Sequence, residues 1–195
     1  MTTKQGSDDW ITQRLGKVTA SVIHKIYSDK ITATKINFAH SLAMERLTVR
    51  RMKNIETIDM VRGLALENKA RIAYETATHQ KVTLVGFIPH PDIKNAGASP
   101  DGFVGEDGFI EIKCLNTRNH NQIVKNKKIP KQYHYQMQFQ LACSRREWGD
   151  FVAYHPEVDE GLYIERVYPD HKIITELHNK VVSFLGEVEV LYRKL

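Results

Sequence analysis

The chain has 195 residues, enough for one well-buried domain and too few for two ordinary ones, so we expect a single domain over residues 1–195. With 42% hydrophobic and 26% charged residues it has the composition of a globular protein, and no apolar run approaches the length that spans a membrane. The net charge of +5, from 28 basic and 23 acidic residues, is too small to identify a nucleic-acid-binding protein by itself.

The location expected from the sequence is the cytoplasm. The N-terminal residues lack the apolar core of a signal peptide. The two cysteines, Cys114 and Cys143, have no metal-binding spacing and fall within an expected strand and an expected helix, which fits a reducing compartment.

Two short helices are predicted at the start of the chain. Ser7 is a good N-cap, followed by two aspartates in the first turn, and Gly16 ends this helix. A second helix begins at Thr19 or Ser21 and ends near Tyr27.

Arg14 lies at the end of the first helix, and the segment from Thr19 to Ser21 opens the second. The first turn of a helix has unpaired N–H groups and the positive end of the helix dipole, so an arginine facing it forms a good phosphate clamp. The alternative is plain N-capping by Thr19 or Ser21, with Arg14 in solvent.

Two longer helices are predicted over residues 37–53 and 58–78. Glu67 stands on the second of them, with Gly63 one turn earlier on the same face, where the missing side chain leaves room for a ligand. The alternative for Glu67 is a surface ion pair with Arg71, four residues later. The apolar stripe of this helix is expected at Leu66, Ala70, Ala73 and Ala77.

The strand region is predicted to begin with a strand over residues 82–89. A tight turn at residues 105–108 then separates the runs 96–104 and 109–115, so these two runs form a hairpin.

The hairpin carries the residues with the clearest chemistry. Glu111 and Lys113 are two residues apart in a strand and share a face, whereas Ile112 points into the core. The pairing also brings Asp101 close to Glu111. This acidic pocket suits a divalent cation such as Mg²⁺ and metal-assisted phosphodiester hydrolysis. An ordinary cross-strand ion pair is the alternative.

The segment from Arg118 to Lys131 has five basic residues and no acidic one, and a second basic cluster lies at Arg50, Arg51 and Lys53. Such segments suit a phosphate backbone, although a solvated basic loop is equally consistent with this composition.

The rest of the chain is predicted to contain a helix at 131–143, strands at 150–155 and 163–168, and a helix at 171–195. The order of elements indicates an α/β fold with a mixed sheet flanked by helices. Gln136 or Gln138, at the end of the first helix nearest the sheet, can hold a water or phosphate oxygen, or simply face solvent.

Several of these residues occur in an ordered series of motifs. The series is Trp10-x-x-x-Arg14-Leu15-Gly16-x-Val18-Thr19-Ala20-Ser21, Gly63-x-x-x-Glu67, Ser99-Pro100-Asp101-Gly102, Glu111-Ile112-Lys113-Cys114 and Tyr133-x-x-Gln136-x-Gln138. In this order and spacing the chain resembles the YqaJ-type viral recombinase family, a lambda exonuclease-like family with the PD-(D/E)XK nuclease fold. Leu115 departs from the family pattern, in which a proline follows the cysteine.

The resemblance implies a Mg²⁺-dependent enzyme, with Mn²⁺ as a possible substitute, that degrades the 5′-ended strand of linear double-stranded DNA. It also implies a toroidal homotrimer and a phage single-strand annealing protein as partners. By position, Asp101, Glu111 and the Ile112 carbonyl bind metal and Glu67 supports a second ion. Lys113 and Gln136 position the attacking water and the scissile phosphate.

The resemblance further assigns Arg14, Thr19 and Ser21 to a pocket for the terminal 5′-phosphate, and Arg118 is a further candidate for DNA contact. Two other functions remain open. One is an endonuclease or junction resolvase of the same fold, and the other is a DNA-binding subunit without catalysis.

Overall fold

The structure is a computed structural model that describes residues 3–50 and 58–195. Its first part is helical, as predicted, and contains α1 (Asp8–Arg14), the short strand β1 (Val18–Thr19), the 3₁₀ helix η1 (Ala20–Lys25), α2 (Ala33–Thr48) and α3 (Ile58–Thr78). Ser7 caps α1 by accepting a hydrogen bond from Trp10 N, which confirms the predicted N-cap. Residues 58–78 form the predicted helix with the predicted bounds.

Two helices differ from their predicted ranges. The second is only the short η1 and ends at Lys25. α2 begins earlier than predicted because Thr32 caps it, accepting a hydrogen bond from Lys35 N, and it ends early because Val49 adopts the left-handed conformation. Part of the second basic cluster, Arg51 and Lys53, lies outside the described residues.

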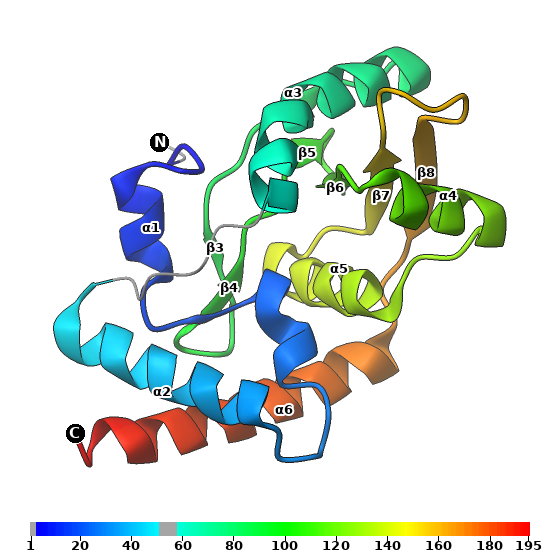
Figure 1. Ribbon diagram of the computed structural model, residues 1–195. Coiled ribbons are helices and arrows are strands. Elements are labelled where there is room, and N and C mark those ends of the chain that lie inside the picture. Colours follow the sequence, from blue (N-terminus) through cyan, green and yellow to red (C-terminus); the bar gives the residue numbers. More distant parts are fainter. Residues whose placement is uncertain (1–2, 51–57) are drawn as a thin grey trace.

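The larger sheet contains, in spatial order, β2 (Val82–Thr83), β5 (Gly102–Val104), β6 (Gly108–Lys113), β7 (Trp148–Tyr154) and β8 (Leu162–Val167). β6 and β7 are parallel, and the other neighbouring strands are antiparallel. The connection from β6 to β7 therefore crosses one face of the sheet, and it carries α4 (Thr117–Asn126) and α5 (Lys131–Ser144), while α3 covers the other face (Figure 1). This is the predicted mixed sheet flanked by helices.

A separate three-stranded sheet contains β1, β4 (Ala96–Ala98) and β3 (Ile88–Pro89), with β4 in the centre. The predicted strands over residues 82–89 and 96–104 were therefore wrong as single elements, because each is divided between the two sheets. Pro100 lacks the N–H that a continuous ladder needs, so β4 and β5 are separated there. Gly97 allows β3 to approach, since a Cβ at this position would clash with the Phe87 ring and the Ile88 backbone.

The basic segment from Arg118 to Lys131 is mostly helical, so the alternative of a solvated basic loop applies only to the few residues between α4 and α5. Asn116 caps α4 by accepting a hydrogen bond from Asn119 N. The helix buries His120 and Ile123 against the sheet, and its basic side chains Arg118 and Lys125 are exposed. Arg118 and Lys125 therefore stand on a helix, and Lys127 and Lys128 follow its end.

α5 lies at the centre of the molecule (Figure 1) and is buried on several sides. Met137 and Leu141 pack against the larger sheet and α4, whereas Phe139 and Cys143 pack against η1, α2 and the C-terminal helix α6 (His171–Tyr192). The sequence predicted both helices, although α6 ends before residue 195. Among the helices in the described ranges, none has the length and apolar character needed to cross a bilayer.

A buried polar network fastens α3 to the sheet. Asp150 on β7 is 1% exposed and accepts hydrogen bonds from Arg166 Nε at 2.8 Å, Arg166 Nη2 at 2.9 Å and the Tyr74 hydroxyl at 2.7 Å. Tyr74 is the centre of the buried face of α3, together with Ala70, whereas Ala77 of the predicted stripe is exposed. The buried face of α3 therefore includes Tyr74, which the predicted stripe did not contain. Its hydroxyl can be buried because it donates a hydrogen bond to Asp150.

We expect Asp150→Ala to destabilise the protein by about 1–3 kcal/mol, because the substitution leaves the buried Tyr74 hydroxyl without its partner and removes the ion pair with the partly exposed Arg166. Urea unfolding followed by circular dichroism measures this loss. Asp159→Ala is the control, since Asp159 is exposed and its replacement changes stability by about 0.5 kcal/mol or less. An equal effect of the two substitutions would contradict the role of the network.

Candidate active site

Four of the five predicted catalytic residues line one cavity of about 430 Å³, and the fifth, Gln136, does not line it but donates a hydrogen bond to Glu111. The cavity wall contains Glu67 from α3, Asp101 from the loop before β5, and Glu111 and Lys113 from β6. Gly63 also lines it, one turn before Glu67, and nothing lies within 4 Å of the position that a Cβ would occupy there. The alternative partner of Glu67 makes a different contact, because Arg71 Nη2 donates a hydrogen bond to Asn68 Oδ1.

The hairpin fixes Asp101 beside Glu111. β5 and β6 pair with Gly102 opposite Ile110, so Asp101 falls opposite Glu111 in the same register. Asp101 N donates to Ile110 O at 3.1 Å, and Asp101 Oδ2 accepts from Ile112 N at 2.6 Å. Both ends of the residue are thus bound to β6, and the predicted proximity of the two carboxylates is confirmed.

Glu111 is the most enclosed of the three carboxylates, with 2% of the residue exposed. Its Oε1 accepts hydrogen bonds from Lys113 Nζ and Gln136 Nε2, both at 2.6 Å, and its Oε2 accepts from Gln140 Nε2 at 2.5 Å. Three donors therefore compensate the cost of burying the charge. Ile112 alternates with these residues and is buried against α3, as predicted.

The two glutamines that bind Glu111 are one helical turn apart on α5, so they reach the same carboxylate. Sequence reasoning selected Gln136 and missed Gln140, although the four-residue spacing was the available signal. Gln138 faces elsewhere: its Nε2 donates to Tyr168 O at 2.9 Å and its Oε1 accepts from Asp170 N at 2.8 Å. Gln138 therefore holds the start of α6 and does not reach the cavity.

The cavity perturbs the protonation of its residues. Burial raises the pKa of Asp101 well above its usual range, and the Glu111 carboxylate raises it further. Burial and the nearby Glu111 likewise raise the pKa of Glu67. Burial lowers the pKa of the Lys113 ammonium, but Glu111 and Asp101 outweigh this effect, so that the pKa is raised and the lysine stays charged. Carboxylates that repel one another beside a fixed cation are typical of a functional site.

The carboxylates suit a hard divalent cation in donor type and in charge. An ionised carboxylate has about four lone-pair positions, and Glu111 uses three of them, so one remains. Asp101 engages only Oδ2 in the hydrogen bond to Ile112 N. Within the described ranges no three His, Cys, Asp or Glu side chains already converge closely enough to hold an ion. The residues therefore fit a metal chemically, and side-chain rotation would have to bring their oxygens together.

A second cluster surrounds Arg14. Its Nη1 donates to Ser99 Oγ at 2.9 Å and its Nη2 to Thr19 Oγ1 at 3.4 Å, while the guanidinium lies over the Trp10 ring, 4.2 Å from the centroid. Trp10 Nε1 also donates to Ser99 Oγ at 3.0 Å, and Ser21 Oγ lies 3.3 Å from Thr19 Oγ1. Arg14, Thr19 and Ser21 therefore come together as predicted, with Ser99 as a further member.

The alternative interpretation of this cluster is not supported. Thr19 is the N-cap of η1, but its side chain makes no capping hydrogen bond and contacts Arg14 instead. Ser99 precedes Asp101 by two residues, so the Arg14 cluster and the carboxylate cavity are joined through Ser99-Pro100-Asp101. Arg118 does not join either group, since it is exposed on α4, although Asn116 and Asn119 from that part of the chain line the cavity.

Known proteins are similar to this chain in sequence and in fold. An alkaline exonuclease, LHK-Exo from Laribacter hongkongensis, has a crystal structure that is similar to this chain, with 39% sequence identity, a TM-score of 0.91, and coverage of 96% of this chain and 95% of that chain. The structure of LHK-Exo in complex with dAMP gives the same values. A phage-related exonuclease from Haemophilus somnus 129PT is 14% identical, with a TM-score of 0.69 over 91% of this chain and 96% of that chain, and it shows the fold alone. No curated protein matches the chain.

The model of the YqaJ-like viral recombinase domain matches residues 9–147, which include both clusters and α5 up to its end. With the likeness to an alkaline exonuclease, this match supports a nuclease function. The predicted resemblance is confirmed, and the chain belongs to the family of YqaJ-like viral recombinase domains.

Proposed function

We propose that the protein is a Mg²⁺-dependent 5′→3′ exonuclease that degrades the 5′-ended strand of linear double-stranded DNA and leaves a 3′ single-stranded tail. The observation that carries this proposal is the short connection between the Arg14 cluster and the carboxylate cavity through Ser99 and Asp101. A cationic group able to hold a terminal phosphate thus lies next to groups able to hydrolyse a phosphodiester. The likeness of this chain to LHK-Exo, which is named as an alkaline exonuclease, also supports the proposal.

In this proposal Asp101, Glu111 and the Ile112 carbonyl hold one Mg²⁺ ion and Glu67 supports a second, with Mn²⁺ as an alternative. A divalent ion at this place supplies an activated water and neutralises charge on the phosphate. Burial raises the pKa of both Glu67 and Asp101, and the Glu111 carboxylate raises each further; a divalent cation held by these carboxylates would offset that repulsion.

The residues of the chain orient the reactants. Lys113 remains an ammonium ion and is fixed at 2.6 Å from Glu111 Oε1, so it can steady the negative charge that develops on the phosphate. Gln136 and Gln140 donate hydrogen bonds to the Glu111 carboxylate from the side of α5 and orient it. Arg14, with Thr19, Ser21 and Ser99, holds the 5′-phosphate, and the exposed Arg118 on α4 contacts the DNA backbone.

The family membership suggests the biological setting of this reaction. We propose a homotrimer that encircles DNA, a phage or prophage recombination pathway in the bacterial cytoplasm, and a single-strand annealing protein that receives the 3′ tail. Size-exclusion chromatography with light scattering tests the trimer directly.

A time course on linear duplex DNA tests the proposed reaction. The substrates have either a 5′-phosphate or a 5′-hydroxyl, a closed circle serves as a control, and each is incubated with Mg²⁺ or with EDTA. The expected result is Mg²⁺-dependent loss of the 5′-phosphorylated strand with intact circles. Cut circles would indicate an endonuclease or resolvase, and binding without any digestion would indicate an inactive DNA-binding subunit.

We expect Lys113→Ala and Glu111→Ala each to slow cleavage by about 100-fold or more, because each removes a charge that acts on the reacting phosphate. Duplex binding should persist, since the exposed basic residues supply most of the affinity. Cleavage is measured by release of labelled nucleotide and binding by fluorescence anisotropy in EDTA. Cleavage at the wild-type rate in either variant would remove that residue from the mechanism.

We expect Arg14→Ala to abolish the preference for phosphorylated ends, because the guanidinium is the charged group of its cluster. The measurement is the ratio of digestion rates on 5′-phosphorylated and 5′-hydroxyl duplexes. Arg193→Ala is the matched control, since the Arg193 side chain is 75% exposed near the C-terminus. A ratio that Arg14→Ala leaves unchanged would place the terminal phosphate elsewhere.

Asp101→Asn should alter the pH dependence of stability. A carboxyl group with a raised pKa in the folded state contributes stability below its unfolded pKa, and this stability is lost as the pH rises through the folded pKa. In EDTA, wild type should therefore lose stability relative to Asp101→Asn over an assay range that starts at about pH 4, near the unfolded-state pKa of an aspartate, and extends to about pH 8. Asparagine stays neutral and can still accept the Ile112 N–H.

Urea midpoints of wild type and Asp101→Asn at both ends of this pH range measure the difference. Addition of Mg²⁺ should stabilise wild type more than the variant, since only wild type has the full set of carboxylates. If the stabilities of the two proteins changed with pH in the same way in EDTA, the environment of Asp101 would not raise its pKa.

A further inference from the structure

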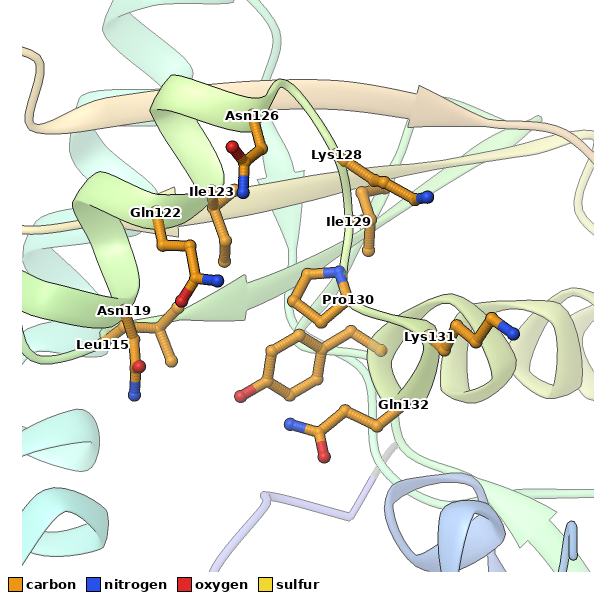
Figure 2. A pocket seen from close by; sticks show the side chains of 11 residues that line it. Leu115, Asn119, Gln122, Ile123, Asn126, Lys128, Ile129, Pro130, Lys131 and Gln132 are labelled. Carbon is orange, nitrogen blue, oxygen red and sulfur yellow. The ribbon is translucent and has the colours of Figure 1, made fainter.

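A second pocket, of about 380 Å³, adjoins the catalytic cavity. It lies between α4 and the start of α5 (Figure 2), and three residues line both hollows: Leu115, Asn119 and Tyr133. The Tyr133 ring packs near Phe151, with centroids 5.7 Å apart, and the Lys113 ammonium lies 5.1 Å from the ring centroid. Tyr133 thus separates the second pocket from the lysine of the catalytic cavity, and whatever occupies the pocket lies next to the reacting groups.

The pocket has an apolar floor and a polar rim. Ile123, Ile129 and Pro130 form the floor, and Ile123 and Ile129 are also part of the core beneath it. The rim carries the carboxamides of Gln122, Asn126 and Gln132. Figure 2 shows Gln122 on α4 and Gln132 on α5, on opposite sides of the pocket. None of these three side chains makes a hydrogen bond to another residue in the described part of the chain.

The charged groups are confined to one edge. Lys128 and Lys131 both line the pocket and are exposed, and Figure 2 shows them together at the side away from Asn119. No acidic side chain lines the pocket. The lining therefore offers apolar contact inside, hydrogen-bond donors and acceptors around it, and positive charge at one edge.

This combination matches one unpaired nucleotide. The apolar floor suits the face of a nucleobase, carboxamides both donate to and accept from base edges, and lysines attract a phosphate. A base inside a duplex presents neither its face nor its pairing edge, so the ligand must be unpaired.

We propose that the pocket between α4 and α5 binds one nucleotide unit of the degraded strand, with the base inside and the phosphate at Lys128 and Lys131. This inference rests on the proposed nuclease function, which brings an unpaired strand to the adjoining cavity. The same chemistry occurs in the strand next to the scissile bond and in the released nucleoside monophosphate, and the following experiment distinguishes them.

The test compares two double variants. Gln122→Ala/Gln132→Ala removes two of the three rim carboxamides, one on each side of the pocket, whereas Asn121→Ala/Asn179→Ala removes two exposed carboxamides that do not line it. All four side chains are exposed, so both proteins should fold, and circular dichroism confirms this. The probes are thymidine 5′-monophosphate and 2-deoxyribose 5-phosphate, titrated calorimetrically in EDTA.

If the released nucleotide occupies the pocket, Gln122→Ala/Gln132→Ala weakens binding of thymidine 5′-monophosphate about tenfold, because two hydrogen-bonding groups are lost. Binding of 2-deoxyribose 5-phosphate stays as in wild type, since it has no base. If the strand occupies the pocket instead, the same variant raises the KM for linear duplex DNA several-fold, and the control variant does not.

Weaker nucleotide binding or a raised KM in the Gln122→Ala/Gln132→Ala variant supports the proposed nucleotide site. Wild-type values of both the nucleotide affinity and the KM overturn the proposal. The test of the nucleotide site can be distinguished from the test of the proposed exonuclease activity. Calorimetric loss in a protein that digests no DNA would retain the nucleotide site and reject the exonuclease. Normal digestion and normal nucleotide binding in the Gln122→Ala/Gln132→Ala variant would retain the exonuclease and reject the site.

Discussion

The buried carboxylate of Glu111 is the constraint on which the rest of the site depends. A charge with 2% exposure is tolerated only when donors surround it, and here Lys113 comes from its own strand while Gln136 and Gln140 come from the central helix. α5 must therefore turn two polar groups toward the sheet while it packs apolar residues on both sides of them. The position of α5 over the sheet and the orientation of the Glu111 carboxylate therefore depend on each other.

The chemistry-bearing part of the fold could be predicted because it depends on local rules. Strand alternation placed Glu111 and Lys113 together, and the turn that follows Val104 brought Asp101 opposite Glu111. The four-residue spacing places Gln140 on the same helix face as Gln136, but it does not show what that face contacts. A glutamine in a helix usually faces solvent, and only the tertiary position of α5 shows that Gln140 faces a charge.

The parts that the sequence did not reveal depend on distant pairing. β4 belongs to a different sheet from β5 because it pairs with β1, a segment almost eighty residues away, and no local pattern records that partner. The meeting of Arg14 with Ser99 has the same origin. Likewise, α4 has only a few inward-facing residues, so its stability as a helix comes from packing against the sheet and from the Asn116 cap.

The segment Ser99-Pro100-Asp101 joins the two groups of the proposed site through the backbone itself. Two residues of extended chain span at most about 7 Å between Cα atoms, and the proline limits how far this span can change. If Arg14 and Ser99 hold the 5′-phosphate of a DNA strand while Asp101 acts at the scissile phosphodiester, this segment constrains the distance between the two phosphates. The short segment then limits how far Ser99 and Asp101 can move apart.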